Sequence, residues 1–529
     1  MPPRYDSTAG GEEEASEIGS KTASTVSFVL VGKLASFILA GIAFIIVARI
    51  LGPGTYGIYT LALAVSGFFG SVGNFGVSTA LNKFIPEYMY RKDRRSLESL
   101  LANGYLITLL AGVALAAVTM ALSGTIAHLL FHNLSYSYFI DLAALSILSS
   151  LLFGASTSAL LGFNNGAHVA AITGIEALFQ SAISIALVLG GLGAAAPIIG
   201  IVAGQFIGFA SSMYFIYVKN GIRALARPSV KEMKRIFRFS LPIAGSGLVQ
   251  TVASNFSLIV LGAFATTVVV GNFGIASKTN SLIDIISGSI SVSLLSMFSA
   301  TVARRKSVRT VARLFNYTMY YALVLLAPIL LFIAVLAKPF SYVAFSGVYT
   351  TAPLYILIMC VGLLAGLAGT YATTLLISAS KVKEVFKYSA AVALIELALL
   401  PVAVPLFKGV GLAVLVYIVA PLVTDALFIW KSNKLFRLNF DFGKLCRISL
   451  ANAVPLALLA PLMLLWGSNY ILLLVTGAVE MLAVYPITLG LFRGIDSTDV
   501  KRIRRMTASI PFIGGAIGVL TGYAAAFLR

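Results

Sequence analysis

Residues 82–122 read NKFIPEYMYRKDRRSLESLLANGYLITLLAGVALAAVTMAL and contain both features that decide the fold. Residues 99–122 carry no charge and are largely apolar. An α-helix needs about 20 such residues to cross the hydrocarbon core of a bilayer. The preceding segment, 82–98, is rich in Lys and Arg, which membrane proteins retain mainly on the cytoplasmic side. This combination predicts a membrane-spanning helix that starts at the cytoplasm.

The same two features alternate along the whole chain. Fifteen apolar stretches lie at about 26–50, 57–80, 99–122, 138–161, 168–190, 195–218, 240–264, 272–300, 312–337, 351–378, 386–406, 410–430, 447–466, 469–491 and 507–528. With the N-terminus in the cytoplasm, 29 of the 38 Lys and Arg residues fall in cytoplasmic gaps. The sequence therefore predicts an all-α polytopic protein of the cell (plasma) membrane with 14–15 transmembrane helices. The number is fourteen if one weakly predicted pair of helices is misread.

The composition excludes several other classes of protein. The chain is 59% hydrophobic and 11% charged, with a mean hydropathy of +0.96, far from a soluble domain. Its apolar runs are long and continuous, unlike the alternating strands of a β-barrel. The net charge of +19 lies in short loops without a nucleic-acid-binding module, so no nucleic-acid partner is expected. A P-loop is also absent from the sequence.

The chain repeats once. Gly54-Thr55-Tyr56-Gly57-Ile58 opens the second predicted helix, and Gly271-Asn272-Phe273-Gly274-Ile275 opens the eighth, 217 residues later. Six helices separate the repeats, so the two halves have parallel topology. The predicted parts are a disordered, acidic cytoplasmic tail (1–25), an N-lobe (26–218), a basic linker (219–239), a C-lobe (240–430) and accessory helices (431–529).

Three short motifs resemble a known family. They are ARILGPGTYGIY at 48–59, FSLP at 239–242 and FSGVYTTAP at 345–353. Together they are similar to polysaccharide-biosynthesis flippases, the Wzx-type members of the multidrug/oligosaccharidyl-lipid/polysaccharide (MOP) exporter superfamily. The resemblance covers about residues 25–430. It implies two MATE-like six-helix lobes of parallel pseudo-symmetry, followed by two to three C-terminal helices.

The resemblance also implies a function. Members of this family move lipid-linked oligosaccharide, on a polyprenyl phosphate or diphosphate, from the cytoplasmic to the outer leaflet by alternating access. The expected substrate is therefore a lipid-linked glycan for cell-surface polysaccharide or glycoprotein synthesis. Membrane lipids and glycan-assembly enzymes are the expected partners. No cofactor is implied, and the lobes would be driven either by an H⁺ or Na⁺ gradient or by the substrate gradient.

Polar residues inside the first and seventh predicted helices are candidates for a substrate cleft. An ionisable residue at a helix centre costs about 2.5–3.5 kcal/mol on insertion scales, so it usually faces protein or a watery cavity. Lys33 lies inside the first predicted helix. The offset of 217 residues makes Gln250 the equivalent position in the seventh predicted helix. Lys33 either lines the cleft as a cation for phosphate or extends its amine back to the interface.

The eighth predicted helix carries a polar stripe. Asn280, Asp284, Ser287 and Ser291 share one helical face. The seventh helix offers a matching face, with Asn255 adjoining it. These stripes either line the lumen or form interhelical hydrogen bonds alone.

Two further cations are candidate substrate contacts. Lys278 resembles the cationic position on the eighth helix of lipid-diphosphate flippases, with Asp284 as its charge partner or as an ion ligand. Arg49 ends the first helix, before Gly52-Pro53-Gly54. It has either a phosphate or gate role or a role in anchoring the helix at the interface.

Three acids inside predicted helices are candidates for ion coupling. Glu176 and Glu396 lie at comparable depths in the equivalent fifth and eleventh helices, and Asp425 lies in the twelfth. The alternative is structural pairing with Lys or hydroxyl groups. His128 and His132 are four residues apart but lack a third ligand nearby, so no metal site is expected.

The function therefore has one leading interpretation and two alternatives. A MATE-like antiporter of small molecules or cationic drugs would call for an acidic lumen, whereas the cleft candidates include Lys33 and Lys278. A membrane glycosyltransferase or ligase would call for catalytic carboxylates on a large outer loop, and the outer gaps 123–137 and 338–350 contain none. The sequence favours a flippase that is not an enzyme.

Overall fold

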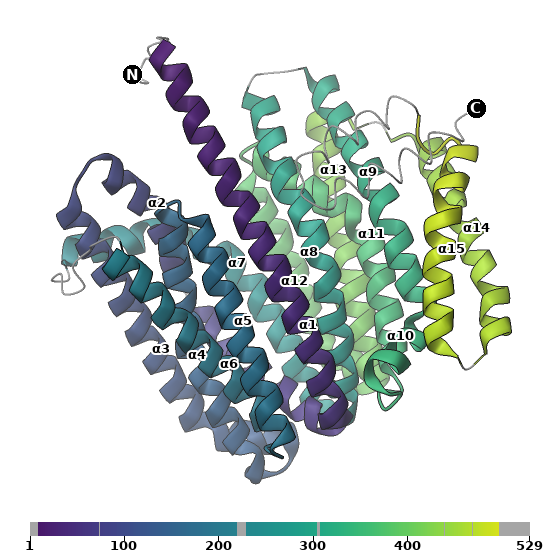
Figure 1. The fold of residues 1–529 in the computed structure, drawn as a ribbon, viewed down its shortest axis with the longest axis horizontal. Helices are drawn as coiled ribbons and strands as arrows, with labels where there is room; N and C mark the ends of the chain where they lie inside the picture. The colour runs from purple at the N-terminus through teal and green to yellow at the C-terminus, as the bar shows by residue number, and fades with distance from the viewer. Residues whose placement is uncertain are drawn as a thin grey trace. The chain divides into compact units, whose positions relative to one another are not determined.

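A computed structural model describes residues 9–73, 75–219, 229–303, 307–438, 440–467 and 469–496 (Figure 1). Within these ranges the chain is helical and contains no strand. Among the described residues, ten stretches are long and apolar enough to cross a membrane: Leu39–Gly73, Arg94–Phe131, Leu134–Gly162, Gly166–Leu189, Ala195–Val218, Val308–Val335, Ala352–Ser378, Val382–Phe436, Phe442–Trp466 and Tyr470–Leu491. The predicted all-α polytopic membrane class is confirmed.

Two of these ten stretches each contain two predicted helices. Helix α1 (Ala9–Gly73) is interrupted at Gly52, where φ is 67° and ψ is 172°, a conformation that only glycine adopts without strain. Helix α12 (Val382–Val414) is interrupted at Lys408, where φ is 49° and ψ is −133°. Each interruption falls between predicted spans, 26–50 and 57–80 in the first case and 386–406 and 410–430 in the second.

The structure differs from the sequence-based expectation at the N-terminus. Residues 9–25 were expected to belong to a disordered tail, but α1 begins at Ala9. This segment is rich in Ala and Glu, which favour helix, and Glu near a helix N-terminus interacts favourably with the helix dipole.

A second difference concerns the basic loop 82–98, which contains much of helix α2 (Val77–Tyr90). Its buried residues, including Val77, Leu81, Phe84 and Tyr88, recur every three to four positions. The segment is therefore an amphipathic helix that buries one face in a hydrophobic core.

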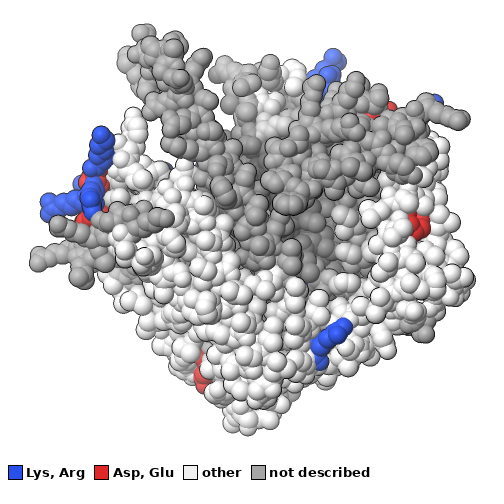
Figure 2. All heavy atoms as spheres, in the orientation of Figure 1, with Lys and Arg blue, Asp and Glu red and all other residues white. Residues whose placement is uncertain are grey.

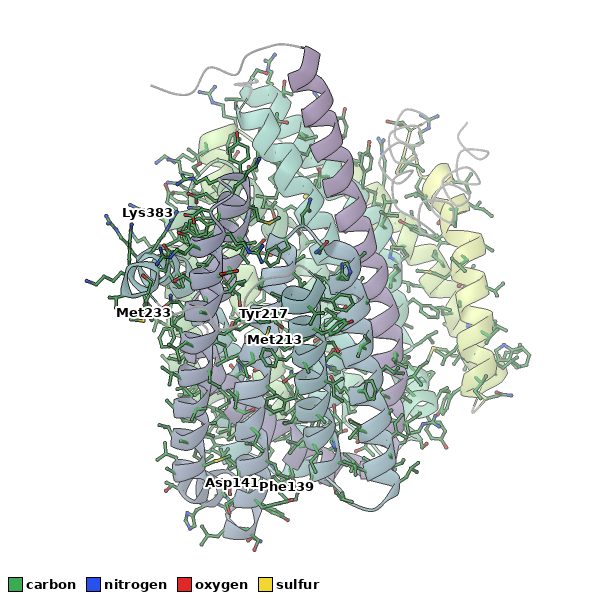
Figure 3. The ribbon with its side chains drawn as sticks, turned by 60° about the vertical axis from the view of Figure 1, so that its left-hand side comes forward. Phe139, Asp141, Met213, Tyr217, Met233 and Lys383 are labelled. Carbon is green, nitrogen blue, oxygen red and sulfur yellow. The ribbon has the colours of Figure 1, made fainter. Side chains whose placement is uncertain are left out.

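The helices pack into two compact units. Unit 1 comprises the residues up to Leu51 and Leu61–Asn255. Besides parts of α1 and α7 (Val230–Phe264), it contains α2, α3 (Arg94–Phe131), η1 (Leu134–Tyr136), α4 (Ser137–Gly162), α5 (Gly166–Leu189), α6 (Ala195–Met213) and η2 (Tyr214–Lys219). Figure 3 shows Phe139 and Asp141 of α4 at the lower end of the view and Met233 of α7 well above them.

Glycines of α6 allow α5 and α6 to pack closely in unit 1. Gly200, Gly204 and Gly208 on α6 face α5, and a Cβ at Gly204 would lie 2.7 Å from the Gln180 Cβ. This approach agrees with the close packing expected of small residues spaced four apart.

Unit 2 comprises Gly52–Thr60 and the chain from Phe256 onwards. It contains the end of α7, α8 (Thr267–Ala303), α9 (Val308–Val335), α10 (Ala337–Phe345), α11 (Ala352–Ser378), α12, η3 (Leu415–Val419), α13 (Ala420–Phe436), α14 (Phe442–Trp466) and α15 (Tyr470–Leu491). Helix α11 packs against α8, α9, α12 and α13.

The accessory helices α14 and α15 attach to α9 and α10. The Tyr485 hydroxyl donates to the Val324 carbonyl at 2.9 Å, and the backbone N–H of Asp441 donates to the Tyr320 hydroxyl at 2.7 Å. Leu336, Leu459 and Leu473 form a buried apolar cluster there. These helices are therefore an integral part of unit 2.

The surface agrees with a membrane environment. On the face drawn in Figure 2, charged side chains of the described residues are few and scattered among uncharged atoms. Large apolar side chains are exposed on many helices, for example Leu110, Leu394 and Leu464. Such a surface needs a lipid environment or a partner to cover it.

Candidate functional site

Several predicted site residues lie where the structure does not describe side chains. Lys33 is in α1, Gln250 in α7 and Asp284 in α8, but their side chains lie outside the described part. Their predicted roles stay predictions.

Helix α8 separates its polar residues onto two faces. Lys278 and Ser281 are exposed, whereas Asn280 is buried with 4% of its surface exposed. The neighbouring Ser277 hydroxyl lies 3.3 Å from the Tyr417 hydroxyl of η3. Lys278 is therefore at the surface of α8, while Asn280 belongs to the interior of unit 2.

Two other predicted substrate contacts, Arg49 and Asn255, also differ in their surroundings. Arg49 is exposed near the interruption at Gly52. Asn255 packs against the second part of α1, because a Cβ at Gly67 would lie 2.6 Å from the Asn255 Oδ1. The Asn255 Nδ2 donates to the Thr251 carbonyl at 2.9 Å. In this conformation Asn255 thus makes interhelical and local contacts.

Residues from all three segments 52–60, 271–275 and 345–355 meet in unit 2, and we call this group the motif cluster. A Cβ at Gly57 would lie 1.8 Å from the Thr267 carbonyl oxygen, and a Cβ at Gly271 would lie 1.9 Å from that of Pro53. Only glycine permits this backbone-to-backbone approach. The two copies of the repeat are therefore in direct contact.

Aromatic rings continue the motif cluster. The rings of Tyr56 and Tyr349 have centroids 6.2 Å apart in an edge-to-face arrangement, and Phe345 lies 5.7 Å from Tyr349. Phe273 lies 5.7 Å from Tyr355. All five side chains are at most 4% exposed. The cluster is a buried, packed core.

Asn272 is a residue of the cluster whose role the sequence reasoning missed. Its Oδ1 accepts hydrogen bonds from the backbone N–H groups of Thr351 and Ala352 at 3.1 and 2.9 Å. It thereby satisfies two of the unpaired donors at the N-terminus of α11. An Asn within a transmembrane stretch was the available signal, but its partner lies 79 residues away.

The three candidate coupling acids have different surroundings. In unit 2 the Ser257 hydroxyl donates to Glu396 Oε1 at 3.4 Å. The Asp425 carboxylate fills a notch in α11, where any side chain at Gly369 would overlap it. In unit 1, Glu176 on α5 lies beside Gly208, whose Cβ would be 3.1 Å from that of Glu176. Glu396 and Asp425 are at most 9% exposed.

A charged network joins α2 to the start of α7, in segments that the sequence predicted to be basic cytoplasmic loops. The Tyr88 hydroxyl donates to the buried Glu232 carboxylate at 2.7 Å, and Arg235 donates to Glu87 at 3.0 Å. The Arg235 guanidinium also lies 4.4 Å above the Phe84 ring. Burial, followed by the hydrogen bond to Glu232, raises the pKa of the Tyr88 hydroxyl well above its ordinary value.

Metal ligation finds no support within the described ranges. They contain no group of three or more His, Cys, Asp or Glu side chains able to hold an ion. Cys360 is buried and Cys446 exposed, and both are free thiols.

Comparison with known proteins adds a family and a fold. Residues 23–302, slightly more than half of the 529 residues, match the family model described as polysaccharide biosynthesis protein. A comparison with curated proteins found no match.

Two solved structures have a similar fold. A structure titled lipid II flippase MurJ, inward closed conformation, is 16% identical, with a TM-score of 0.73 over 88% of this chain and 98% of the other. A multidrug resistance MATE family transporter of the MOP superfamily, in an inward-facing conformation, is 15% identical. Its TM-score is 0.66 over 76% of this chain and 95% of the other.

Proposed function

Because the chain belongs to the polysaccharide biosynthesis protein family, we propose that it moves a lipid-linked glycan from the cytoplasmic to the outer leaflet of the plasma membrane by alternating access. The family match is the observation that carries this proposal. The fold likeness to a lipid II flippase over 88% of the chain supports it. The protein would act as a transporter and not as an enzyme, with its N-terminus in the cytoplasm.

The chemistry of the substrate explains why a protein is needed. A buried hydroxyl without a hydrogen bond costs roughly 2–7 kcal/mol, so an oligosaccharide crosses hydrocarbon extremely slowly. A polar path removes this cost for the sugar and phosphate, while the polyprenyl tail stays in lipid. The exposed Lys278 of α8 supports an anionic substrate, and Arg49, Lys33 and Gln250 are further proposed contacts.

The driving force would be an ion gradient. Glu396 and Asp425 in unit 2 and Glu176 in unit 1 are the proposed H⁺ or Na⁺ coupling residues, since all three lie inside membrane helices. Glycan-assembly enzymes on the two sides of the membrane would supply the substrate and consume the product.

A reconstituted system tests the proposal. Purified protein in liposomes that contain a polyprenyl-diphosphate oligosaccharide should expose the glycan to an outside lectin or glycosidase faster than empty liposomes do. Lys278→Ala should lower the rate about ten- to hundredfold, since hydrogen bonds to charged groups contribute about 1.5–3 kcal/mol. Lys338→Ala, which removes another exposed lysine of unit 2, is the matched control.

A small-molecule antiporter is the second candidate, because the MATE transporter shares the fold. If liposomes translocate no lipid-linked glycan under imposed proton or sodium gradients but exchange an organic cation for protons, the antiporter replaces the flippase. Equal glycan transport by Lys278→Ala and the wild type would remove Lys278 from the substrate path.

A further inference from the structure

Helix α2 ends at the level where two membrane-spanning helices of unit 1 begin or end. A Cβ at Gly162, the last residue of α4, would lie 3.0 Å from the Ile85 Cβ of α2. Helix α3 begins at Arg94, shortly after α2 ends at Tyr90. Both α3 and α4 are long and apolar enough to cross a membrane. The end of α2 therefore lies where the chain passes from hydrocarbon to the headgroup region.

The exposed sides of α2 and of the start of α7 are basic. On α7, Lys231, Lys234 and Arg238 are exposed and share one helical face, whereas Glu232 and Ile236 on the other face are buried. Helix α2 and the turn to α3 add five exposed cations. We call the eight exposed residues the basic surface: Lys83, Arg91, Lys92, Arg94, Arg95, Lys231, Lys234 and Arg238.

The carboxylates of the same segments, 82–98 and 229–239, all have partners within unit 1. They are Glu87 (with Arg91 and Arg235), Asp93 (with the Ser96 N–H), Glu98 (with Arg94) and Glu232 (with the Tyr88 hydroxyl), at 2.7–3.1 Å. The other six cations of the basic surface form no ion pair within the described part of the chain. The surface therefore presents a net positive charge to its surroundings.

Large apolar side chains lie exposed among these cations. Tyr90 is 90% exposed and Met89 is 47% exposed at the end of α2, and Val230, next to Lys231 in the sequence, is 63% exposed. Tyr has an apolar body and a polar tip, which suits the boundary between acyl chains and headgroups. Cations mixed with exposed apolar side chains are typical of helices that lie at the surface of an anionic membrane.

We propose that the basic surface binds the headgroups of anionic phospholipids in the adjoining leaflet, with Met89 and Tyr90 at the top of the acyl chains. Clusters of about four to eight Lys and Arg residues beside a membrane-spanning helix attract anionic lipids, and each cation contributes about fivefold in affinity. Under the topology proposed above, this is the cytoplasmic leaflet. The interaction involves none of the proposed substrate contacts and would hold α2 and the start of α7 at the membrane surface.

Spin-labelled lipids test this proposal in nanodiscs that contain the purified full-length protein. A dye is attached at Tyr90→Cys after the exposed native thiol has been removed by Cys446→Ser. Phosphatidylglycerol with a nitroxide high on its acyl chain should quench this dye severalfold more than phosphatidylcholine labelled in the same way. Added salt should reduce the difference, because it screens exposed charges.

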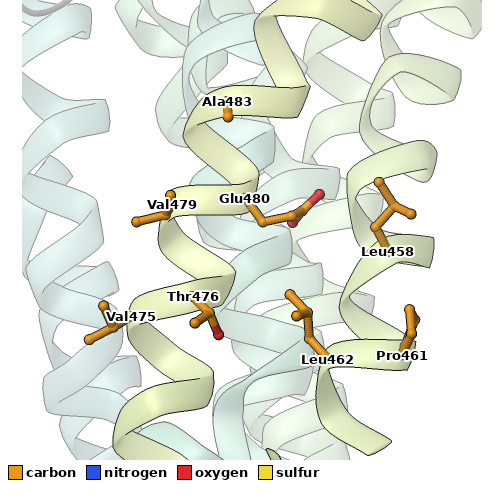
Figure 4. A pocket seen from close by; sticks show the side chains of 8 residues that line it. All are labelled: Leu458, Pro461, Leu462, Val475, Thr476, Val479, Glu480 and Ala483. Atoms are coloured by element: carbon orange, nitrogen blue, oxygen red, sulfur yellow. The ribbon is translucent and has the colours of Figure 1, made fainter. Parts of the chain in front are cut away.

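A dye at Val479→Cys is the matched control for position. Val479 is 62% exposed and lines an apolar groove between α14 and α15 (Figure 4). Glu480 is the one charged residue among the side chains that line this groove, so the groove offers no cation to a lipid phosphate. The two labelled lipids should therefore quench the dye at Val479 equally.

Charge variants show whether the basic surface is the site. Lys231→Gln with Lys234→Gln should raise the fraction of phosphatidylglycerol that half-saturates quenching at Tyr90 by about tenfold or more, since two cations are lost. Lys231→Arg with Lys234→Arg keeps both charges and should behave like the parent. Lys338→Gln with Lys408→Gln removes two exposed lysines of unit 2 and should also leave the quenching unchanged.

Two results would overturn the proposal. One is equal quenching of the dye at Tyr90 by the two lipids. The other is an undiminished preference for phosphatidylglycerol in the double Gln variant, which would leave the surface to a soluble partner. Neither measurement requires transport, so the outcome is independent of the glycan translocation assay.

Discussion

Asn272 shows how one buried side chain organises this membrane protein. It lies on α8, yet it accepts hydrogen bonds from the first N–H groups of α11, and the one from Ala352 is buried. Gly57 and Gly271 permit a second close contact, in which the backbones of the second part of α1 and the start of α8 touch. At the residue scale, the motif cluster depends on the absence of a side chain at some positions and on one amide at another.

Replacement of Asn272 by Ala should destabilise the protein by about 1–3 kcal/mol, because the buried N–H of Ala352 loses its acceptor. The partly buried N–H of Thr351 loses the same acceptor. The measurement is thermal unfolding in detergent. Asn133→Ala is the control. Asn133 accepts a solvent-exposed hydrogen bond from the Ser135 N–H at 2.9 Å, so its replacement should lower stability much less. Similar losses for both variants would contradict the assigned role.

Gly57→Ala should be among the most damaging small substitutions in the chain. The new Cβ would lie 1.8 Å from the Thr267 carbonyl oxygen, so backbones must separate, at a cost of about 3 kcal/mol or more. Gly174→Ala on α5 meets nothing within 4 Å and should be neutral or stabilising by up to about 1 kcal/mol. Expression level and unfolding temperature compare the two variants, and a tolerated Gly57→Ala would argue against the backbone contact.

At the scale of elements, α7 connects the two units along its own length. Its first turns carry Glu232 and Arg235, which bind α2 in unit 1, whereas its last residues from Phe256 onwards belong to unit 2. The sequence predicted a division at residues 219–239 because the charges gather there. The packing instead divides the helix itself, since burial of Glu232 ties its beginning to α2.

Tyr88→Phe should loosen the start of α7. Removing the hydroxyl deprives the buried Glu232 carboxylate of the hydrogen bond from Tyr88, which costs about 1–3 kcal/mol. Hydrogen exchange of the backbone amides of residues 230–240 should become faster. Arg94→Ala removes the surface pair with Glu98 at 3.1 Å and should change exchange by little. Unchanged exchange in Tyr88→Phe would show that the network does not hold α7.

At the scale of the whole molecule, the chain passes between the two units at three peptide bonds, after Leu51, Thr60 and Asn255. Division into two units is compatible with the alternating access that we propose. The candidate coupling acids are distributed over both units, and the accessory helices are bound to unit 2 through α9 and α10.

Glu396→Gln should uncouple glycan transport from the ion gradient while preserving the fold, because the amide keeps the contact with Ser257 but cannot exchange a proton or carry a charge. Initial transport rates in liposomes, with and without an imposed proton or sodium gradient, measure this. Glu480→Gln changes an acid of the accessory hairpin and should keep the gradient dependence. A Glu396→Gln variant that still responds to the gradient would exclude this residue from coupling.

The sequence by itself determined the class of fold and most helix positions. Backbone polar groups in hydrocarbon must be satisfied within the helix, so an apolar run of about 20 residues has essentially one structure. The interruption at Gly52 was visible in the same way, because Gly52-Pro53-Gly54 disfavours helix locally. The motifs at 48–59 and 345–353 also pointed to the family to which the chain belongs.

Only the tertiary structure decided which polar residues meet. Residue spacing placed Lys278 and Asn280 near one stripe of α8, but packing against neighbouring helices buries Asn280 and leaves Lys278 exposed. The partners of Asn272 and Glu232 lie 79 or more residues away, and no local pattern encodes them. Such contacts arise from the summed packing of many helices, because each polar side chain must find its partner wherever the fold places one.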